Sequence, residues 1–163
     1  MKAFDFLPRS HNERDGVIHG SHYREVFLTK GEHLHPVIAV LNSKLFYLWF
    51  VIISNCRDLS AREVLQFPFD PQGSSPKLLK ELESLGQTLM SDYRKKATLK
   101  VRMQKTTGRM ELQEIDPRKS TAILDEIDTV LAGHYGFTAE ELDFILNYDI
   151  KYRLGRDAEG EEE

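Results

Sequence analysis

The spacing of hydrophobic residues changes several times along the chain, and each spacing predicts a different kind of element. Apolar residues alternate with polar ones over residues 3–7 and 24–29, which predicts two short strands near the N-terminus. The Asp-Gly and His-Gly pairs at 15–16 and 19–20 are turn signals between them. The N-terminal part is therefore expected to form strands and turns.

The longest apolar block runs from Leu45 to Ile53 and contains the only tryptophan of the chain. A membrane-spanning helix needs about 20 mostly apolar residues, and this block is too short. Extending it toward Pro36 brings Lys44 into the middle, where a charge is costly. We therefore predict a buried helix rather than a membrane span, with a second helix before it and a capping break at Asn-Ser, residues 42–43.

Two capping boxes predict where further helices begin. In each box, a hydroxyl residue is followed three positions later by a glutamate: Ser60 with Glu63, and Thr138 with Glu141. The first helix must be short because prolines follow it closely. The second is expected to stop near Gly155.

The middle of the chain changes from helical to alternating spacing. Leucines at helical spacing predict a long helix over residues 77–96. Residues 97–115 then alternate apolar and polar positions around a Thr-Thr-Gly turn, which predicts a β-hairpin. Asp116 and Pro117 are suited to the N-cap and first position of a helix that continues to Gly133.

Together these elements predict an α+β fold. It is helix-rich, with short N-terminal strands, buried central helices, a β-hairpin and two C-terminal helices. The length of 163 residues suits one compact domain. Within it we distinguish an α+β recognition-type part (residues 1–71), a helix, basic hairpin and C-terminal helices packed on it (72–157), and an acidic, disordered tail (158–163).

Charge is distributed unevenly behind a net charge of −4. Residues 93–119 carry nine Lys and Arg against three Asp and Glu, whereas residues 120–163 carry three against twelve. Apolar and charged fractions of 40% and 29% are ordinary for a globular protein. The single cysteine, Cys56, excludes an internal disulfide, and no signal peptide is recognised, so we expect a cytoplasmic protein.

No cluster of residues predicts an active site. The glycines lack the spacing of a phosphate-binding loop. His33 and His35 form at best a weak zinc pair, and Cys56 has no nucleophile signature around it. We interpret the acidic residues of the C-terminal helices as solvent-facing charges: Asp125, Asp128, Glu140 and Asp143. An enzyme of unrecognised type stays open as an alternative, without a constellation that supports it.

Three segments of the chain are similar to one family. These are "GSHYREVFL" (20–28), "VIAVLNSKLFYLWFVIISNCRDLSAREVLQFPFDP" (37–71) and "STAILDEIDTVLAGHYGFTAEELDFILNYDIKYRLGRD" (120–157). In this order they resemble the C-terminal part of bacterial N6-adenine DNA methyltransferases of restriction–modification systems, including fused type IIG-like restriction and methylation enzymes. The third segment is the most specific match.

The resemblance implies a target-recognition region that grips duplex DNA while a separate domain methylates a flipped adenine. That family uses S-adenosylmethionine, but its methyl-donor loop and its Asn-Pro-Pro-Tyr/Phe motif are absent here, and no Asn-Pro dipeptide occurs in the 163 residues. We therefore expect no catalysis and no cofactor in this chain alone. A methyltransferase catalytic domain, in cis or in trans, is the expected partner of such a module or truncated reading frame.

Basic residues are the expected phosphate contacts, because Lys and Arg supply most of the affinity for duplex DNA. Lys44 is one candidate. The others lie in the predicted hairpin and the helix end before it: Arg94, Lys95, Lys96, Lys100, Arg102, Lys105 and Arg109. Lys100 and Arg102 are alternate residues and should share one face of a strand. A solvated amphipathic hairpin without a DNA role is the competing interpretation.

Two other short segments could contact bases. Asn55 and Arg57 follow the apolar block, and these side-chain types bind adenine and guanine edges bidentately. Arg57 could instead pair with Asp58 or cap a helix. Ser21, His22 and Arg24 form a similar candidate set at a predicted strand start. A protein-interaction module that self-associates, for example as a homodimer, stays open as the alternative function.

Overall fold

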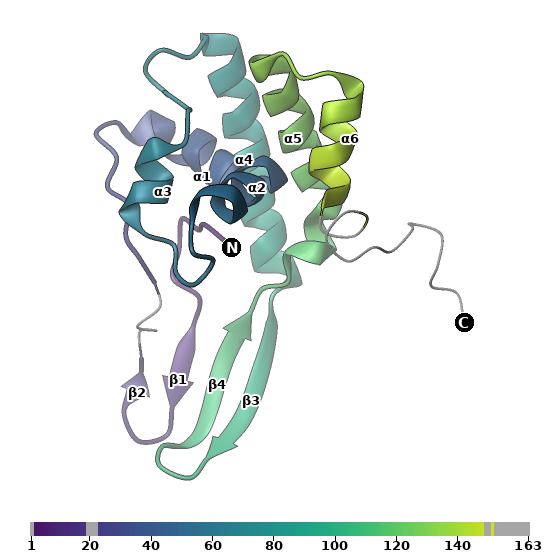
Figure 1. Cartoon of the computed structure of the whole chain (residues 1–163). Coiled ribbons are helices and arrows are strands. Elements are labelled where there is room, and N and C mark those ends of the chain that lie inside the picture. Colours follow the sequence, from purple (N-terminus) through teal and green to yellow (C-terminus); the bar gives the residue numbers. More distant parts are fainter. Residues whose placement is uncertain (1, 19–22, 149–150, 152–163) are drawn as a thin grey trace.

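The computed structural model describes residues 2–18, 23–148 and 151 (Figure 1). It has an α+β fold, as predicted: a body of helices, from which an antiparallel sheet projects on one side. The helices of the described residues are α1 (Leu34–Asn42), α2 (Lys44–Ile53), α3 (Ala61–Gln66), α4 (Pro76–Lys96), α5 (Thr121–Tyr135) and α6 (Ala139–Asn147). Two 3-10 turns, η1 (Gly31–His33) and η2 (Pro117–Ser120), precede α1 and α5.

The sheet joins both halves of the chain. Its strands are β1 (Ser10–Asn12), β2 (Gly16–Val17), β3 (Thr98–Gln104) and β4 (Gly108–Glu114), in the order β2-β1-β4-β3. All neighbours are antiparallel, and Ser10 of β1 lies opposite Leu112 of β4. A single sheet therefore contains strands from both parts that we distinguished at residues 71 and 72.

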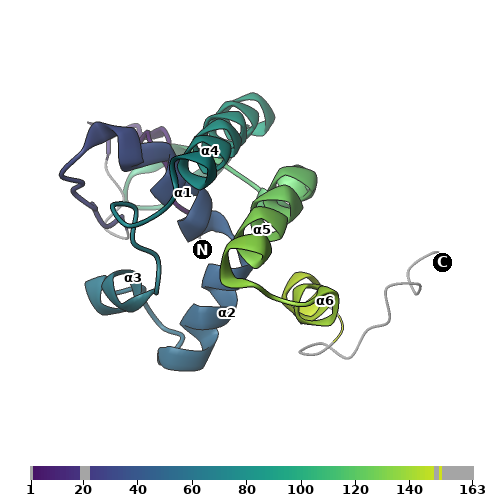
Figure 2. The ribbon, with the colours of Figure 1, turned by 90° about the horizontal axis from the view of Figure 1, so that it is seen from above.

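The core lies between the helices. Helix α4 packs against α1 and α5 (Figure 2). Gly86 of α4 touches α1 so closely that an added Cβ would collide with the backbone carbonyl of His35. Residues with no more than 1% exposure line this contact region and its surroundings: Ala39, Phe46, Leu82, Leu89, Met90, Tyr93, Ile127 and Leu131. Burial of such side chains is the main source of stability in the body.

The apolar block forms the predicted helix, α2, with Ser43 as its N-cap. The helix is less buried than predicted, since only Phe46 and Leu48 of its residues are buried and Ile52 is 70% exposed. The Ser43 hydroxyl accepts a hydrogen bond from the Phe46 N–H at 3.0 Å. Among the described residues, none of the helices is by itself long and apolar enough to cross a membrane. The pair Gly31–Asn42 and Lys44–Ile53, bent by 66°, passes that test only jointly, by length and composition. Both helices contribute side chains to the core.

Two predicted strands are wrong. Residues 3–7 form no strand, because Phe4 packs its ring edge-on against Tyr93 and Phe6 also packs on the core. Their alternation reflects contact with helices rather than a sheet. Residues 24–29 are also without secondary structure, and Phe27 is 87% exposed. The observed N-terminal strands are β1 and β2 instead.

Most of the other boundaries are confirmed to within a few residues. Both capping boxes form, α4 begins one residue before its predicted start, and the hairpin lies within residues 97–115. The helix predicted to end at Gly133 continues to Tyr135, where Gly136 (φ 72°) ends it in the left-handed region. The predicted stop near Gly155, the turn at 19–20 and the tail 158–163 lie outside the described residues.

Candidate nucleic-acid interface

Strand β3 carries basic and apolar side chains on different faces, whereas together with its cross-strand partners on β4 each face of the hairpin carries both kinds. Lys100 lies opposite Leu112 and Arg102 opposite Met110, so the two cations share one face, as predicted. The other face of β3 carries three apolar residues: Leu99, Val101 and Met103. Every residue of β3 is exposed, and the strand projects away from the helical body (Figure 1). Both faces of β3 are therefore accessible to a partner.

The two cations differ in how they are already paired. The Lys100 ammonium lies 2.6 Å from the Glu114 carboxylate, and this hydrogen bond holds the pKa of Glu114 below its usual range. Arg102 lowers that pKa further through space. Among the described residues, no carboxylate forms an ion pair with Arg102 within 4.0 Å. Arg102 is therefore the more available cation of the two.

The hairpin tip carries the other two candidate cations. Arg109 pairs with Glu111 at 3.0 Å, and its backbone N–H donates to the Glu13 carboxylate at 3.1 Å. Lys105 lies in the exposed turn between β3 and β4 and has no ion pair with a described carboxylate. Arg109 thus helps to hold the tip against the end of β1, whereas Lys105 extends the accessible positive charge.

The end of α4 places Lys95 and Lys96 at the base of the hairpin. The Lys96 ammonium lies 2.8 Å from the Asp92 carboxylate and donates to the Lys119 carbonyl at 2.5 Å. Burial alone would raise the pKa of Asp92, but hydrogen bonds from Lys96 and Ser120 outweigh it and lower this pKa. Lys95 is exposed. Cations here also interact favourably with the helix dipole, which gives them a structural role without DNA.

Arg94 is held against the N-terminal segment. Its guanidinium lies 2.6 Å from the Asp5 carboxylate and 4.4 Å from the centre of the Phe6 ring. These contacts hold Asp5 and Phe6 against the end of α4. Of the basic residues predicted here, Lys95, Arg102 and Lys105 therefore remain without a described ion-pair partner.

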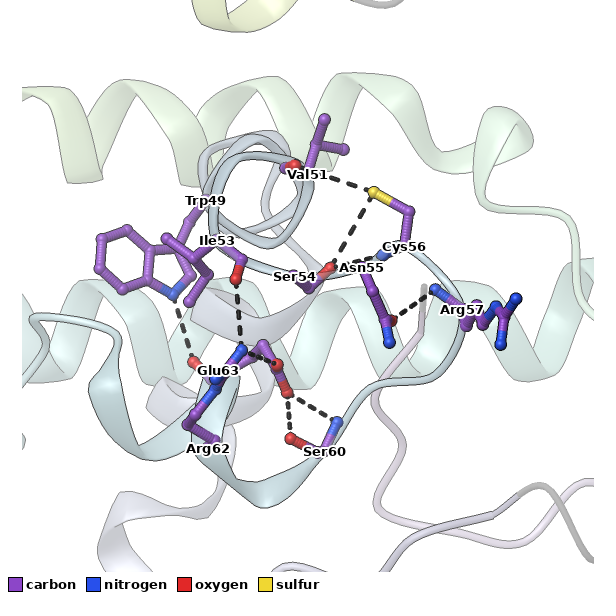
Figure 3. A network of polar contacts seen from close by, with 10 residues as sticks. All are labelled: Trp49, Val51, Ile53, Ser54, Asn55, Cys56, Arg57, Ser60, Arg62 and Glu63. Atoms are coloured by element: carbon purple, nitrogen blue, oxygen red, sulfur yellow. Dashed lines mark hydrogen bonds and ion pairs between the residues drawn. The ribbon is translucent and has the colours of Figure 1, made fainter.

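The loop between α2 and α3 holds Asn55 and Arg57 in a network of local hydrogen bonds (Figure 3). The Asn55 side-chain oxygen accepts from the Arg57 N–H at 3.1 Å, and the Ser54 hydroxyl accepts from the Cys56 N–H at 3.0 Å. Cys56 has a φ of 57°, in the left-handed region that non-glycine residues rarely adopt. The backbone of this loop is therefore specified by its own side chains.

The end of the same loop is fastened to α3. Glu63 is buried, and its carboxylate accepts from the Ser60 backbone N–H at 2.8 Å and from the Ser60 hydroxyl. Hydrogen bonding to Ser60 is the main reason that the pKa of Glu63 falls to about 2. The Arg57 side chain extends away from this network (Figure 3). Its guanidinium forms no ion pair with Asp58 or another described carboxylate.

Lys44 is engaged within the body. Its ammonium lies 2.7 Å from the Asp125 carboxylate and donates to the Leu146 carbonyl at 3.2 Å. The side chain is 30% exposed. Lys44 therefore connects α2 with α5 and α6, and contact with DNA would require it to exchange these partners.

The interpretation of Asp128 as a solvent-facing acid is wrong. It is 2% exposed, and its carboxylate accepts from the backbone N–H groups of Lys44 and Leu45, both at 3.0 Å. Burial raises the pKa of Asp128 to about 6, although these hydrogen bonds act in the opposite direction. The signal was present in the sequence, since Asp128 falls on the buried stripe with Leu124 and Leu131.

Of the three remaining predicted residues, the structure describes one, Arg24. Arg24 is exposed in the irregular segment before η1. Ser21 and His22 lie outside the described residues. In the part of the chain that the structure describes, no group of three or more His, Cys, Asp and Glu residues could hold a metal ion.

A separate apolar pocket of about 170 Å³ opens between α2 and the loop that joins α5 to α6. Its lining includes Trp49, Ile52, Phe67, Tyr135 and Phe137. The Tyr135 hydroxyl donates to the Pro68 carbonyl at 2.9 Å, which holds this wall in place. The Ile52 side chain at the rim is 70% exposed.

Comparison with family models, with curated proteins and with solved structures found no match to this chain.

Proposed function

We propose that this chain binds duplex DNA through the β3–β4 hairpin and the adjoining end of α4. In this proposal it is a target-recognition fragment of a restriction–modification adenine methyltransferase, located in the bacterial cytoplasm and not catalytic by itself. It holds no cofactor of its own, and a methyltransferase catalytic domain that uses S-adenosylmethionine is its partner in cis or in trans. The resemblance of residues 20–157 to that family supports the assignment.

One observation carries the proposal: the basic segment of the chain forms a projecting hairpin instead of packing on the body. Lys100 and Arg109 keep 48% and 58% of their side chains exposed although each is ion-paired. Lys100 and Arg102 lie on one face of this narrow ribbon and Arg109 on the other, so cations of both faces can reach phosphates if the ribbon enters a groove. The net charge of −4 repels DNA at long range, so the local positive charge of the hairpin has to outweigh this repulsion.

The ion pairs predict an order of importance among the cations. Lys95, Arg102 and Lys105 gain phosphate contacts without losing a described carboxylate, so they should contribute most. Lys100 and Arg109 must exchange Glu114 and Glu111 for phosphates, so their net contribution should be smaller. Each phosphate contact that releases a counterion steepens the fall of log affinity with log salt concentration by about 0.9.

Sequence selectivity, in this proposal, comes from the loop between α2 and α3. Arg57 projects from a loop with a well-defined backbone, and an arginine can bind guanine bidentately. The Asn55 side-chain oxygen already accepts a hydrogen bond from the Arg57 N–H within its own loop. The second lone pair of this oxygen and the amide N–H₂ group can still form hydrogen bonds with a base. Ser21, His22 and Arg24 are additional candidate contacts.

Selection from a pool of random-sequence duplexes, at several salt concentrations, tests the proposal. Sequencing of the bound DNA should reveal a short enriched motif, and Arg57→Ala should abolish the enrichment while the salt dependence stays. Salt-sensitive binding without a motif would contradict a recognition role and indicate only non-specific contacts with DNA phosphates. Absence of binding at low salt would contradict DNA binding by the chain alone.

Self-association or protein binding is the second candidate function, because apolar residues are exposed on the helical body. Ile52 at the pocket rim, Leu65 on α3 and Phe27 are 70%, 82% and 87% exposed. Clusters of exposed apolar residues often mark interaction sites. Sedimentation velocity over a range of protein concentrations should show dimers if this function dominates, and Ile52→Glu should then restore the monomer.

A further inference from the structure

Strand β3 forms an open edge of the sheet. Among the described residues, the order β2-β1-β4-β3 gives it one neighbour, and its seven residues pair with β4 one to one, without a bulge. All seven residues are exposed, and none is a proline. Sheet edges are usually protected from pairing by shortness, bulges, prolines, charges or a covering element. On β3 the two charges of Lys100 and Arg102 are the protection that the sequence provides.

The register determines which backbone groups of β3 face the open edge. On β4, the Gln113 N–H donates to the Arg9 carbonyl on the β1 side at 2.8 Å. Successive residues of a strand direct these groups to opposite sides, so Leu112 faces β3 and pairs with Lys100. The backbone N–H and C=O groups that face the open edge therefore belong to the odd-numbered residues of β3: Leu99, Val101 and Met103.

A second copy of β3 is a poor partner for this edge. Antiparallel pairing centred on Val101 places Lys100 opposite Arg102 of the other copy. Pairing centred on Lys100 or on Arg102 places that residue opposite itself. Like charges directly opposite each other destabilise a strand pair. The charges thus disfavour self-pairing but favour a strand with carboxylates at the same positions.

We propose that β3 binds an extended peptide segment of another protein, which adds to the sheet as a further strand. The segment carries acidic residues on the face of Lys100 and Arg102, and apolar residues on the opposite face. There it covers Leu99, Val101 and Met103, which are 53%, 48% and 76% exposed. In such strand addition the backbone supplies affinity and alternate side chains supply specificity. This interaction does not depend on the proposed DNA binding.

The first test uses the full chain and a fluorescent seven-residue peptide, as long as β3, that alternates glutamate with valine. Anisotropy should detect binding of this peptide and not of its lysine–valine counterpart. Val101→Pro removes an N–H that faces the open edge and leaves the bonds to β4, so affinity should fall by about tenfold. Val101→Thr keeps that N–H and is the matched control, with a change of less than about threefold.

A second test reverses one charge on β3 and does not depend on the Val101→Pro variant. Arg102→Glu should weaken the glutamate peptide and strengthen the lysine peptide, because the complementary charge moves to the other partner. Equal binding of both peptides, or unchanged affinity in Val101→Pro, overturns the proposal. Since Val101→Pro removes no charge, it should leave the salt dependence of DNA binding unchanged, so failure of one proposal is distinguishable from failure of the other.

Discussion

The helical body and the projecting sheet use their apolar residues in opposite ways. In the body, Leu82 and Ile127 are fully buried, and the closest helix contact excludes even a methyl group at Gly86. In the sheet, the alternating apolar residues of β3 stay exposed although the strand itself is regular. Apolar side chains therefore stabilise the fold in the body, whereas on β3 they leave a surface for a partner. This contrast supports our proposals that the sheet binds a partner.

The largest expected difference in stability is between alanine substitutions of a core leucine and of a sheet valine. Leu82→Ala removes fully buried methyl groups from α4 and should lower the free energy of unfolding by about 3 kcal/mol. Val101→Ala, on the half-exposed strand face, should lower it by less than about 1 kcal/mol. Urea denaturation followed by the fluorescence of Trp49 measures both. Equal losses would show that the hairpin face is covered in solution.

One acidic residue in each region should change the free energy of unfolding with pH, and the two changes should have opposite signs. Asp128 has a pKa of about 6, above its unfolded value, because it is buried. Its ionisation between about pH 4 and pH 6 therefore opposes folding, and the stability that the protonated form contributes at low pH is lost as the pH rises. Relative to Asp128→Asn, the wild type should lose up to about 3 kcal/mol across this range. Denaturation curves from pH 4 to pH 7 measure the difference.

Glu114 of the sheet is the control with the opposite sign. Its pKa is lowered, mainly by the hydrogen bond from Lys100, so its contribution to stability is present above its ordinary pKa and is lost as the pH falls through the lowered value. Relative to Glu114→Gln, the wild type should therefore lose stability only in acid. A fall toward neutral pH in this comparison would contradict the assigned ion pair.

Two glycines test the tightness of the body. Ala is favoured over Gly in helix interiors by about 1 kcal/mol. Gly133→Ala on α5, where an added Cβ meets no atom within 4 Å, should therefore stabilise the protein. Gly86→Ala should destabilise it by about 1–3 kcal/mol despite the same gain, because α1 must move away from α4. Thermal unfolding of both variants measures the difference, and a stabilised Gly86→Ala would contradict the close helix contact.

The sequence predicted well those features that depend on neighbouring residues. The capping boxes, the Ser43 break and the hairpin follow from local side-chain chemistry and alternation. The features that failed depend on distant partners. Strand β1 reads Ser-His-Asn and has no strand signal, because its partner Leu112 lies about a hundred residues away. Asp128 likewise caps α2 across 84 residues of sequence.

The candidate site was predictable in composition but not in accessibility. The basic segment was visible in the charge pattern, but the ion pairs of Lys96, Lys100 and Arg109 with nearby carboxylates required the folded register. The exposure of the apolar face of β3 was also hidden, because alternation alone does not show what covers a strand. Only the folded arrangement distinguishes Arg102 from Lys100.

The salt dependence of duplex binding tests the central claim, that the hairpin is the DNA-binding element, most directly. The experiment compares the wild type with two double variants, Arg102→Gln/Lys105→Gln and Lys77→Gln/Lys80→Gln. Lys77 and Lys80 are exposed and lie near the start of α4. Both double variants remove two positive charges. The hairpin variant should bind more weakly and reduce the slope of log affinity against log salt by about 2, whereas the α4 variant should retain the wild-type slope. Equal slopes in the two variants would contradict the claim.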